Sequence, residues 1–210
     1  MKVVLTGISV MLVLILVFVN IADYALYSSK RNLIARGIDH SVCAAIQEVD
    51  LVLSKVGLSE GFDPETGEIL VNDIRLNEET AENAFFSTLA ANTSVNRTDI
   101  NANIFIAYVW PTAAGINYLI KKENERHEGF VVSPDRLEEA INNAIDILWD
   151  TSNPQSDSHL IYVNGNPSTN GFKSTPYFIV FIKDYQIDGL FRKRTATFVG
   201  FAGAKLERRQ

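Results

Sequence analysis

Histidine and cysteine are the side chains that most often act as base, nucleophile or metal ligand near neutral pH, and this chain has few of them. The three histidines, His40, His127 and His159, are far apart, and none belongs to an H-E-x-x-H pattern or to a zinc-ligand cluster with cysteines. His40 and the single cysteine, Cys43, are one helical turn apart, a spacing open to a base and its nucleophile. The pair lacks an orienting acid and an evident pocket, so we interpret both as ordinary positions on a helix.

Two loop sequences come close to ion-binding or phosphate-binding patterns without matching them. Residues 165–174, GNPSTNGFKS, have five residues between the glycines where the phosphate-binding loop has four, and Phe172 precedes the lysine. Pro176 and a predicted strand follow, so no helix N-terminus is available to a phosphate. Residues 63–67, DPETG, lack the spacing and the closing glutamate of a calcium loop. We predict no catalytic residue, no metal site and no cofactor, and keep an anchored enzyme with an unfamiliar site as an alternative.

The beginning of the chain is apolar and free of proline, which predicts one long helix from residue 3 to about residue 56. Residues 3–19, VVLTGISVMLVLILVFV, are hydrophobic on every side of such a helix. Because about 20 apolar residues span a hydrocarbon core of roughly 30 Å, we predict a transmembrane helix over residues 1–28. The alternatives are a cleaved signal peptide and a buried core helix. The residues expected to face lipid or neighbouring helices are Val3, Leu5, Ile8, Met11, Leu12, Leu14, Ile15, Phe18, Val19 and Tyr24.

Two polar residues, Asn20 and Asp23, lie near the end of this span. Polar groups inside a bilayer are often functional, so an intramembrane role is one interpretation. We favour a simpler one, in which both residues already lie in the interfacial region. Tyr24 and Tyr27 would form an aromatic belt at the same level.

The second part of the predicted helix, residues 29–57, is amphipathic. Its apolar residues recur at steps of three and four and form one stripe, which needs a partner surface such as a sheet. Gly57 is the predicted end of the helix. The residues predicted to pack this part of the helix on a sheet are Ile34, Ile38, Val42, Ala45, Val49, Val52 and Val56.

Residues 58–210 are predicted to form one globular α+β head domain. Two segments, 104–110 and 177–182, are apolar on both faces, which is typical of strands in the middle of a covered sheet. Asp188 and Gly189 predict a hairpin turn between the last two strands. The other predicted segments are strands at 68–76, 116–120, 159–163 and 195–204, and a polar loop at 92–103.

Two helices are predicted within the head domain. Asn77 is a suitable N-cap for the first, over residues 78–91, and two glutamates follow it in the first turn. Ser133 and Pro134 are typical of the start of the second helix, which we expect to end near Trp149. Its apolar residues recur on one face, so it also needs a surface to cover.

Composition excludes some classes of function. The chain has 210 residues and a net charge of −6, which provides no general electrostatic attraction to nucleic acid, so we predict no nucleic-acid partner. The basic run of residues 192–194 is short and is interpreted as a hairpin turn or a solvated face. One cysteine allows no intrachain disulfide, which fits either a cytoplasmic domain or a cell-surface protein without disulfides.

An apolar span that continues as an amphipathic helix and then packs on a sheet resembles the plan of type IV pilins and pseudopilins. Within that group the chain is similar to the TadE/TadG-like proteins of tight-adherence pilus systems. The resembling parts are residues 3–56, with YSSKRN at 27–32 and Ala44-Ala45, and the strand, hairpin and small-residue strand of 177–204. The expected fold class is α+β, a pilin-like lollipop. In it, a long N-terminal helix with a transmembrane half and an amphipathic half packs on an antiparallel sheet with two further helices.

The resemblance implies a structural function, as a minor pilin-like or assembly subunit of a surface filament or secretion apparatus. The partners would be membrane lipid and other pilin-like subunits, joined in homo- or hetero-oligomers through the N-terminal helix. The type IV leader, with a Gly or Ala junction followed by Phe and then Glu, is absent, so we expect a minor subunit. The alternative is a membrane-tethered extracytoplasmic module that binds or senses a ligand through loops 92–103 and 164–175.

Topology is open to two predictions. Lys2 and the amino terminus precede the span, while Lys30, Arg31 and Arg36 follow it, so a count of positive charges alone would place the head in the cytoplasm. The resemblance implies the opposite orientation, because the heads of filament subunits face outward. We therefore predict a single-pass protein of the cell membrane with its head domain outside.

Overall fold

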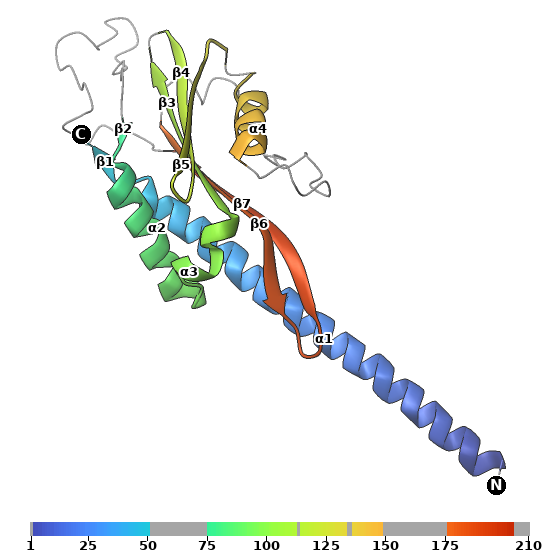
Figure 1. The fold of residues 1–210 in the computed structure, drawn as a ribbon. Helices are drawn as coiled ribbons and strands as arrows, with labels where there is room; N and C mark the ends of the chain where they lie inside the picture. Colours follow the sequence, from blue (N-terminus) through green and yellow to red (C-terminus); the bar gives the residue numbers. More distant parts are fainter. Residues whose placement is uncertain (1, 51–74, 113, 134–135, 149–175, 204–210) are drawn as a thin grey trace, which may run out of the picture.

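One long helix runs past a five-stranded sheet and extends far beyond it (Figure 1). The structure is a computed structural model that describes residues 2–50, 75–112, 114–133, 136–148 and 176–203. The elements in chain order are α1 (Lys2–Ala45), β1 (Val49–Asp50), β2 (Arg75–Leu76), α2 (Glu78–Thr93), α3 (Arg97–Ile100), the 3-10 turn η1 (Asn101–Asn103), β3 (Ile104–Thr112), β4 (Gly115–Lys122), β5 (Glu125–Val131), α4 (Leu137–Leu148), β6 (Tyr177–Asp188) and β7 (Lys193–Gly203).

The sheet is antiparallel throughout, with the strand order β5-β4-β3-β6-β7. The two strands predicted to be central, β3 and β6, lie side by side in the middle, with Ile104 opposite Ile182 and Val109 opposite Tyr177. Both are buried on both faces because each face of the sheet is covered by a helix layer. The α+β fold class predicted from the sequence is confirmed.

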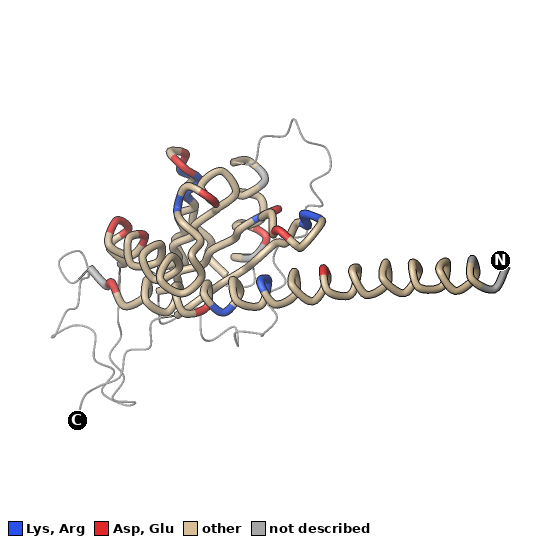
Figure 2. The backbone as a smooth tube through the Cα atoms, turned by 90° about the horizontal axis from the view of Figure 1, so that it is seen from below, with Lys and Arg blue, Asp and Glu red and all other residues tan. Residues whose placement is uncertain are grey.

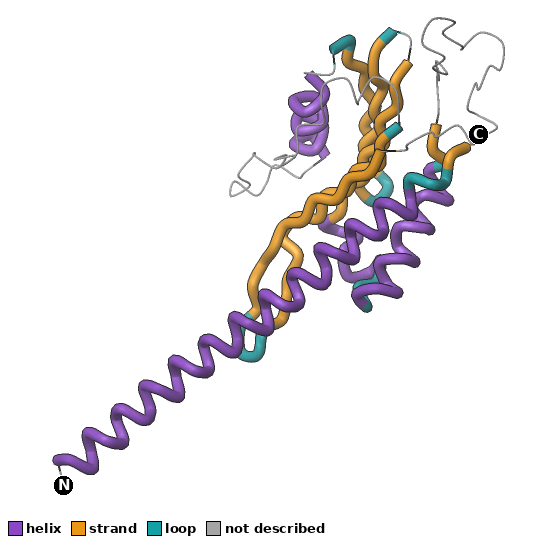
Figure 3. The backbone as a smooth tube through the Cα atoms, turned by 180° about the vertical axis from the view of Figure 1, so that it is seen from behind, coloured by secondary structure: helices purple, strands orange, loops and turns teal. Residues whose placement is uncertain are grey.

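The two covering layers differ in composition. α1 and α2 lie on one face of the sheet and α4 lies on the other, as Figure 3 shows from behind. Alternate residues of β3 divide between two cores: Ile104, Ile106 and Tyr108 point to α1 and α2, while Phe105 and Val109 point to α4. The predicted pair of further helices is present as α2 and α4, and the single turn α3 adds to them.

The long helix ends earlier than its apolar stripe predicts. α1 stops at Ala45, and the amide N–H groups of Gln47 and Glu48 donate to the carbonyls of Ala44 and Ala45, which tightens the last turn. The prediction of a helix through residue 57, with Gly57 as its end, is wrong for this reason.

Val49 is therefore corrected from a helical packing residue to a strand residue. It lies in β1 and pairs with Leu76 of β2, and β-branched side chains favour such extended backbone. Val52 and Val56, the last two predicted packing residues, lie outside the described residues. The same is true of the predicted strand at 159–163 and of most of the one at 68–76.

The N-terminus of α2 follows from local sequence. The side chain of Asn77 accepts a hydrogen bond from the backbone N–H of Thr80 at 3.1 Å, and Glu78 and Glu79 occupy the first turn. The helix ends at Ser94, which adopts the left-handed conformation with φ of 62°. The segment predicted as a polar loop, 92–103, instead contains the end of α2, the turn α3 and η1.

Two strands, β5 and β3, differ from what the sequence predicts. β5 was not predicted, because its exposed residues Glu125, Arg126 and Glu128 resemble a loop in composition. Charged residues are common on edge strands, where they discourage pairing with other chains. β3 also continues beyond the predicted segment 104–110, through Pro111, which pairs with Ile116 near the turn into β4.

Candidate functional site

The first half of α1 projects from the head with its side chains uncovered. We call residues 4–21 the bare segment: apart from Val19, which is half-buried, its described side chains are exposed, with exposed fractions of 71% at Phe18 and 65% at Met11. No residue between Val3 and Ala22 is charged, and in Figure 2 the tube is tan along most of the helix that projects from the head. The helix is long and apolar enough to span a membrane.

The residues predicted to face lipid or neighbouring helices lie on all sides of this segment. Val3 and Leu5 belong to α1, but their side chains lie outside the description. Val19 is half-buried. The remaining predicted residues are exposed, and they are Ile8, Met11, Leu12, Leu14, Ile15, Phe18 and Tyr24.

The side chain of Asn20 makes a hydrogen bond within the helix itself. Its side-chain amide donates to the carbonyl of Leu16 at 2.7 Å. This bond pairs one amide hydrogen without a partner from another element. The hydrogen bond of Asn20 therefore stays within α1, whereas Asp23, about one turn later, bonds to the head.

Asp23 is where the head first meets the helix. Its carboxylate is 3% exposed, because the tip of the β6–β7 hairpin covers it. Oδ1 accepts a hydrogen bond from the backbone N–H of Phe191 at 2.8 Å, and Oδ2 forms an ion pair with Nη2 of Arg194 at 3.3 Å. Charge-assisted bonds of this kind compensate for burying the carboxylate. A contact across 168 residues of sequence thus ties the hairpin to α1.

Aromatic and backbone contacts extend this connection along the helix. The guanidinium of Arg194 lies over the rings of Tyr24 and Tyr27, at 5.3 and 5.4 Å from their centroids. The hydroxyl of Tyr27 donates to the carbonyl of Thr195 at 3.3 Å. We call this set of contacts the helix–hairpin junction.

One more turn of the helix contributes to the helix–hairpin junction. Nζ of Lys30 donates to the carbonyl of Asp188 at 2.8 Å. Gly189, predicted as part of the hairpin turn, is required there, because an added Cβ would lie 2.5 Å from Oδ1 of Asp23 and 2.7 Å from the carbonyl of Arg192. The junction therefore requires both the carboxylate of Asp23 and the absence of a side chain at Gly189.

The sequence contains the parts of this junction but does not indicate that they meet. Asp23 was interpreted as an interfacial residue and residues 192–194 as a turn or solvated face. The available signal was complementary charge: one acid directly after the uncharged part of the helix, and a basic run beside a predicted hairpin turn. Nothing local pairs these segments, because their contact depends on where the sheet places the hairpin.

The second half of α1 is buried in the head along one face. Of the residues predicted to pack on the sheet, Ile34, Ile38, Val42 and Ala45 are 8, 1, 1 and 0% exposed, in the core shared by α1, α2 and the sheet. Helix and sheet approach closely at Gly200 of β7, where an added Cβ would collide with the side chain of Ile38. We call residues 34–46 the packed segment.

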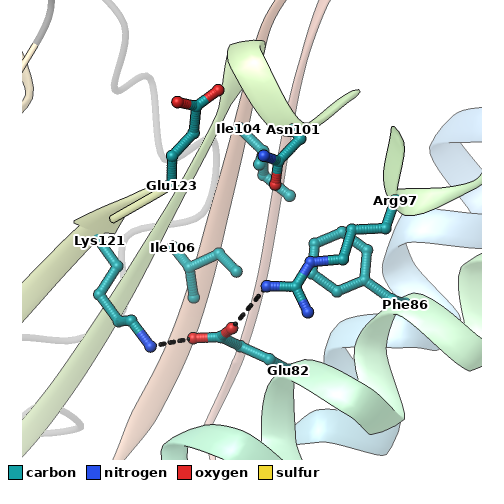
Figure 4. Close-up of a pocket in the computed structure, with 8 residues that line it drawn as sticks. All are labelled: Glu82, Phe86, Arg97, Asn101, Ile104, Ile106, Lys121 and Glu123. Carbon is teal, nitrogen blue, oxygen red and sulfur yellow. Dashed lines mark hydrogen bonds and ion pairs between the residues drawn. The ribbon is translucent and has the colours of Figure 1, made fainter. Parts of the chain in front are cut away.

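A charged cluster lies between α2 and the sheet (Figure 4). The side chain of Glu82 is 10% exposed and forms ion pairs with Lys121 of β4 and with Arg97 of α3, the latter at 3.3 Å. Its Oε1 also accepts a hydrogen bond from the hydroxyl of Tyr108 at 2.9 Å. Burial, together with the neighbouring carboxylate of Glu82, raises the pKa of Tyr108, so the tyrosine stays protonated.

The chemistry open to this cluster is limited by space. The partly open hollow that it lines has a volume of about 20 Å³, enough for one or two water molecules and too small for an organic substrate. The guanidinium of Arg97 also lies 4.7 Å from the centroid of the Phe86 ring, which closes one side. The cluster therefore fastens α2 and α3 to the sheet.

The histidines and the cysteine do not assemble into a reactive site in the part of the chain described here. His40 and Cys43 are both exposed on α1. His127 stacks on Tyr118 with ring centroids 6.4 Å apart, and His159 lies outside the described residues. Among the described residues there is no group of three or more His, Cys, Asp or Glu side chains that could hold a metal.

Comparison with known proteins identified no relative of this chain. No protein-family model matches the chain, and no curated protein or solved structure matches it. The bare segment, the helix–hairpin junction and the packed segment are therefore the features of this chain that bear on its function.

Proposed function

We infer that this chain is a membrane-anchored structural subunit, a minor pilin-like component of a surface filament or secretion apparatus. The anchor is the bare segment, and the head, held outside the membrane, supplies lateral contacts. The subunits assemble as homo- or hetero-oligomers through α1. The single observation that carries this proposal is that one continuous helix, α1, is uncovered and apolar at one end and buried in the head at the other.

The exposed apolar surface of the bare segment favours an apolar environment. Soluble monomers rarely expose contiguous apolar patches larger than a few hundred Å². Here the side chains along residues 8–18 are exposed on every side of the helix, and most are large and apolar. Lipid before assembly, and neighbouring α1 helices after it, would both cover such a surface.

The helix–hairpin junction suits a structural role. It ties the head to α1 at Asp23, directly after the uncharged part of the helix, so the head cannot swing freely about the anchor. A subunit of an ordered assembly needs such a fixed orientation, because each head must repeat the same lateral contacts. A tethered ligand-binding module has no such requirement.

Single cysteines in the bare segment test the assembly part of the proposal. Cys43 is exposed and is the only native cysteine, so Cys43→Ser provides the background. Met11→Cys, Leu14→Cys and Phe18→Cys would each be oxidised in native membranes and examined for disulfide-linked species on non-reducing gels. Asn83→Cys, exposed on α2, is the control.

We expect linked species at one or more positions of the bare segment and none at Asn83. If no position along the bare segment forms a linked species, and the protein extracted in mild detergent is strictly monomeric, the assembly proposal fails. A reporter fused after Gln210 tests the topology separately. Reporter activity on the cytoplasmic side would overturn the surface location while leaving the anchor intact.

A further inference from the structure

The tip of the β6–β7 hairpin exposes two large apolar side chains. Leu190 is 56% exposed and Phe191 is 66% exposed. The turn that carries them is well ordered by hydrogen bonds: the N–H of Gly189 donates to the carbonyl of Arg192 at 2.8 Å, and the N–H of Phe191 donates to Asp23. A fixed turn that holds two apolar side chains away from the core points to an external apolar contact.

The position of the tip along α1 indicates what that contact is. The backbone N–H of Phe191 donates a hydrogen bond to Asp23, and the residues before Asp23, back to Val3, carry no charge. Residues 4–22 rise about 28 Å in a helix, close to the roughly 30 Å of a hydrocarbon core. Figures 1 and 3 show the hairpin turn beside α1 at the point where the helix leaves the head. The tip therefore lies where the hydrocarbon of a spanned membrane would end.

The charged residues of the tip also suit a position at the boundary of the membrane. Arg192 and Lys193 follow the two apolar residues and are exposed, and Arg31 is exposed on the adjacent part of α1. Lys193 is 3.5 Å from Asp188, an ion pair in which both side chains are about two-thirds exposed. An apolar pair followed by basic residues is typical of segments that enter a headgroup region containing anionic lipid.

We propose that residues 190–193 form a second membrane contact, in which Leu190 and Phe191 enter the boundary between headgroups and acyl chains. Arg192 and Lys193 contact lipid phosphates there. A neighbouring copy of the bare segment is the other candidate occupant, but it would bring no negative charge to the two basic residues. The inference rests on the membrane anchorage proposed above and adds a second point of attachment, which sets the tilt of the head.

Fluorescence quenching by lipid tests this contact. In the Cys43→Ser background, Phe191→Cys, Phe18→Cys and Val132→Cys would each carry an environment-sensitive fluorophore, with the full chain in vesicles of phosphatidylcholine and phosphatidylglycerol. Phe18 reports the anchor. Val132 is the control, because it is 77% exposed and follows Val131, which pairs with Ile116 at the far end of the sheet from the tip. Brominated lipids serve as quenchers, with bromine near the headgroup or deep in the acyl chain.

We expect the fluorophore at 191 to be blue-shifted and quenched most by shallow bromine, the fluorophore at 18 to be quenched by deep bromine, and the one at 132 to be unaffected. Quenching at 18 without quenching at 191 overturns the tip contact and leaves the anchor standing. Quenching at neither position overturns both. A disulfide between two chains at 191, in place of lipid quenching, would assign the tip to a second copy and also overturn the proposal.

Discussion

The two halves of α1 share one backbone, yet their surroundings are opposite, and the more apolar half is the exposed one. Ile15 in the bare segment is 49% exposed, whereas Ile38 in the packed segment is 1% exposed. The sequence differs in pattern, since the first half is apolar on every side and the second half carries a single apolar stripe. Apolar content alone therefore does not determine burial; the width of the apolar surface determines which environment can cover it.

Matched isoleucine substitutions in the two halves should give the largest difference in the free energy of unfolding. Ile38→Ala removes buried volume from the core under the sheet and should lower the free energy of unfolding by about 2–5 kcal/mol. Ile15→Ala should change it by less than about 0.5 kcal/mol. Denaturant unfolding of the full chain in detergent micelles, followed by tryptophan fluorescence, measures both. Equal losses in the two variants would contradict the division of α1 into a bare and a packed segment.

A charge placed on each half tests the membrane role next. Leu14→Lys puts an ammonium near the centre of the bare segment, at a cost of about 2.5–3.5 kcal/mol for membrane insertion. Leu33→Lys places the same charge at an exposed position beyond Asp23, where Leu33 is 52% exposed. We expect carbonate-resistant membrane association to fall only for Leu14→Lys. An unchanged membrane fraction for that variant would reject the bare segment as the anchor.

The junction between the two halves can be weakened directly. Asp23→Ala leaves the N–H of Phe191 and the guanidinium of Arg194 without the carboxylate, and should destabilise the hairpin tip by about 1–3 kcal/mol. Hydrogen exchange at the amide of Gly189 reports this, because that amide bonds within the hairpin and not to Asp23. Asp39→Ala, an exposed acid on the same helix, is the control. Similar exchange in both variants would show that Asp23 does not order the tip.

Removal of a single hydroxyl should have the smallest effect on the free energy of unfolding. Tyr27→Phe removes the hydrogen bond to the carbonyl of Thr195 and keeps the ring beneath Arg194, so it should cost about 0.5–1.5 kcal/mol. Tyr24 is 59% exposed and no hydrogen bond of its hydroxyl contributes to the helix–hairpin junction, so Tyr24→Phe should be close to neutral. Unfolding in micelles, measured as above, compares the two. A larger loss of unfolding free energy for Tyr24→Phe than for Tyr27→Phe would indicate that the hydroxyl of Tyr24, and not that of Tyr27, stabilises the junction.

Periodicity allowed much of the fold to be predicted. The strands β3 and β6 were expected to be central from their apolar residues on both faces, and Asn77 was expected to cap α2 from its type and position. Those features depend on neighbours within a few residues. β5 was missed because an edge strand buries little, so its residues carry no apolar pattern.

The end of α1 shows the limit of a periodic pattern. Steps of three and four continue through Val49, but a run rich in β-branched residues fits a strand equally well. Pairing of Val49 with Leu76 decides in favour of a strand, and that pairing joins segments that lie on either side of a long stretch of chain. Val49 and Leu76 are too far apart in the sequence for a local pattern to include both, so periodicity could not predict the pairing.

The sequence by itself determined that this chain has a helix able to span a membrane, followed by an α+β head, because apolar length and periodicity act locally. Only the tertiary structure decided which charges meet. Asp23 pairs with Arg194 and Glu82 pairs with Lys121 because the sheet brings the hairpin and β4 to those helices. Contacts between distant residues depend on the placement of whole elements, which is set by the packing of two cores and not by the residues in contact.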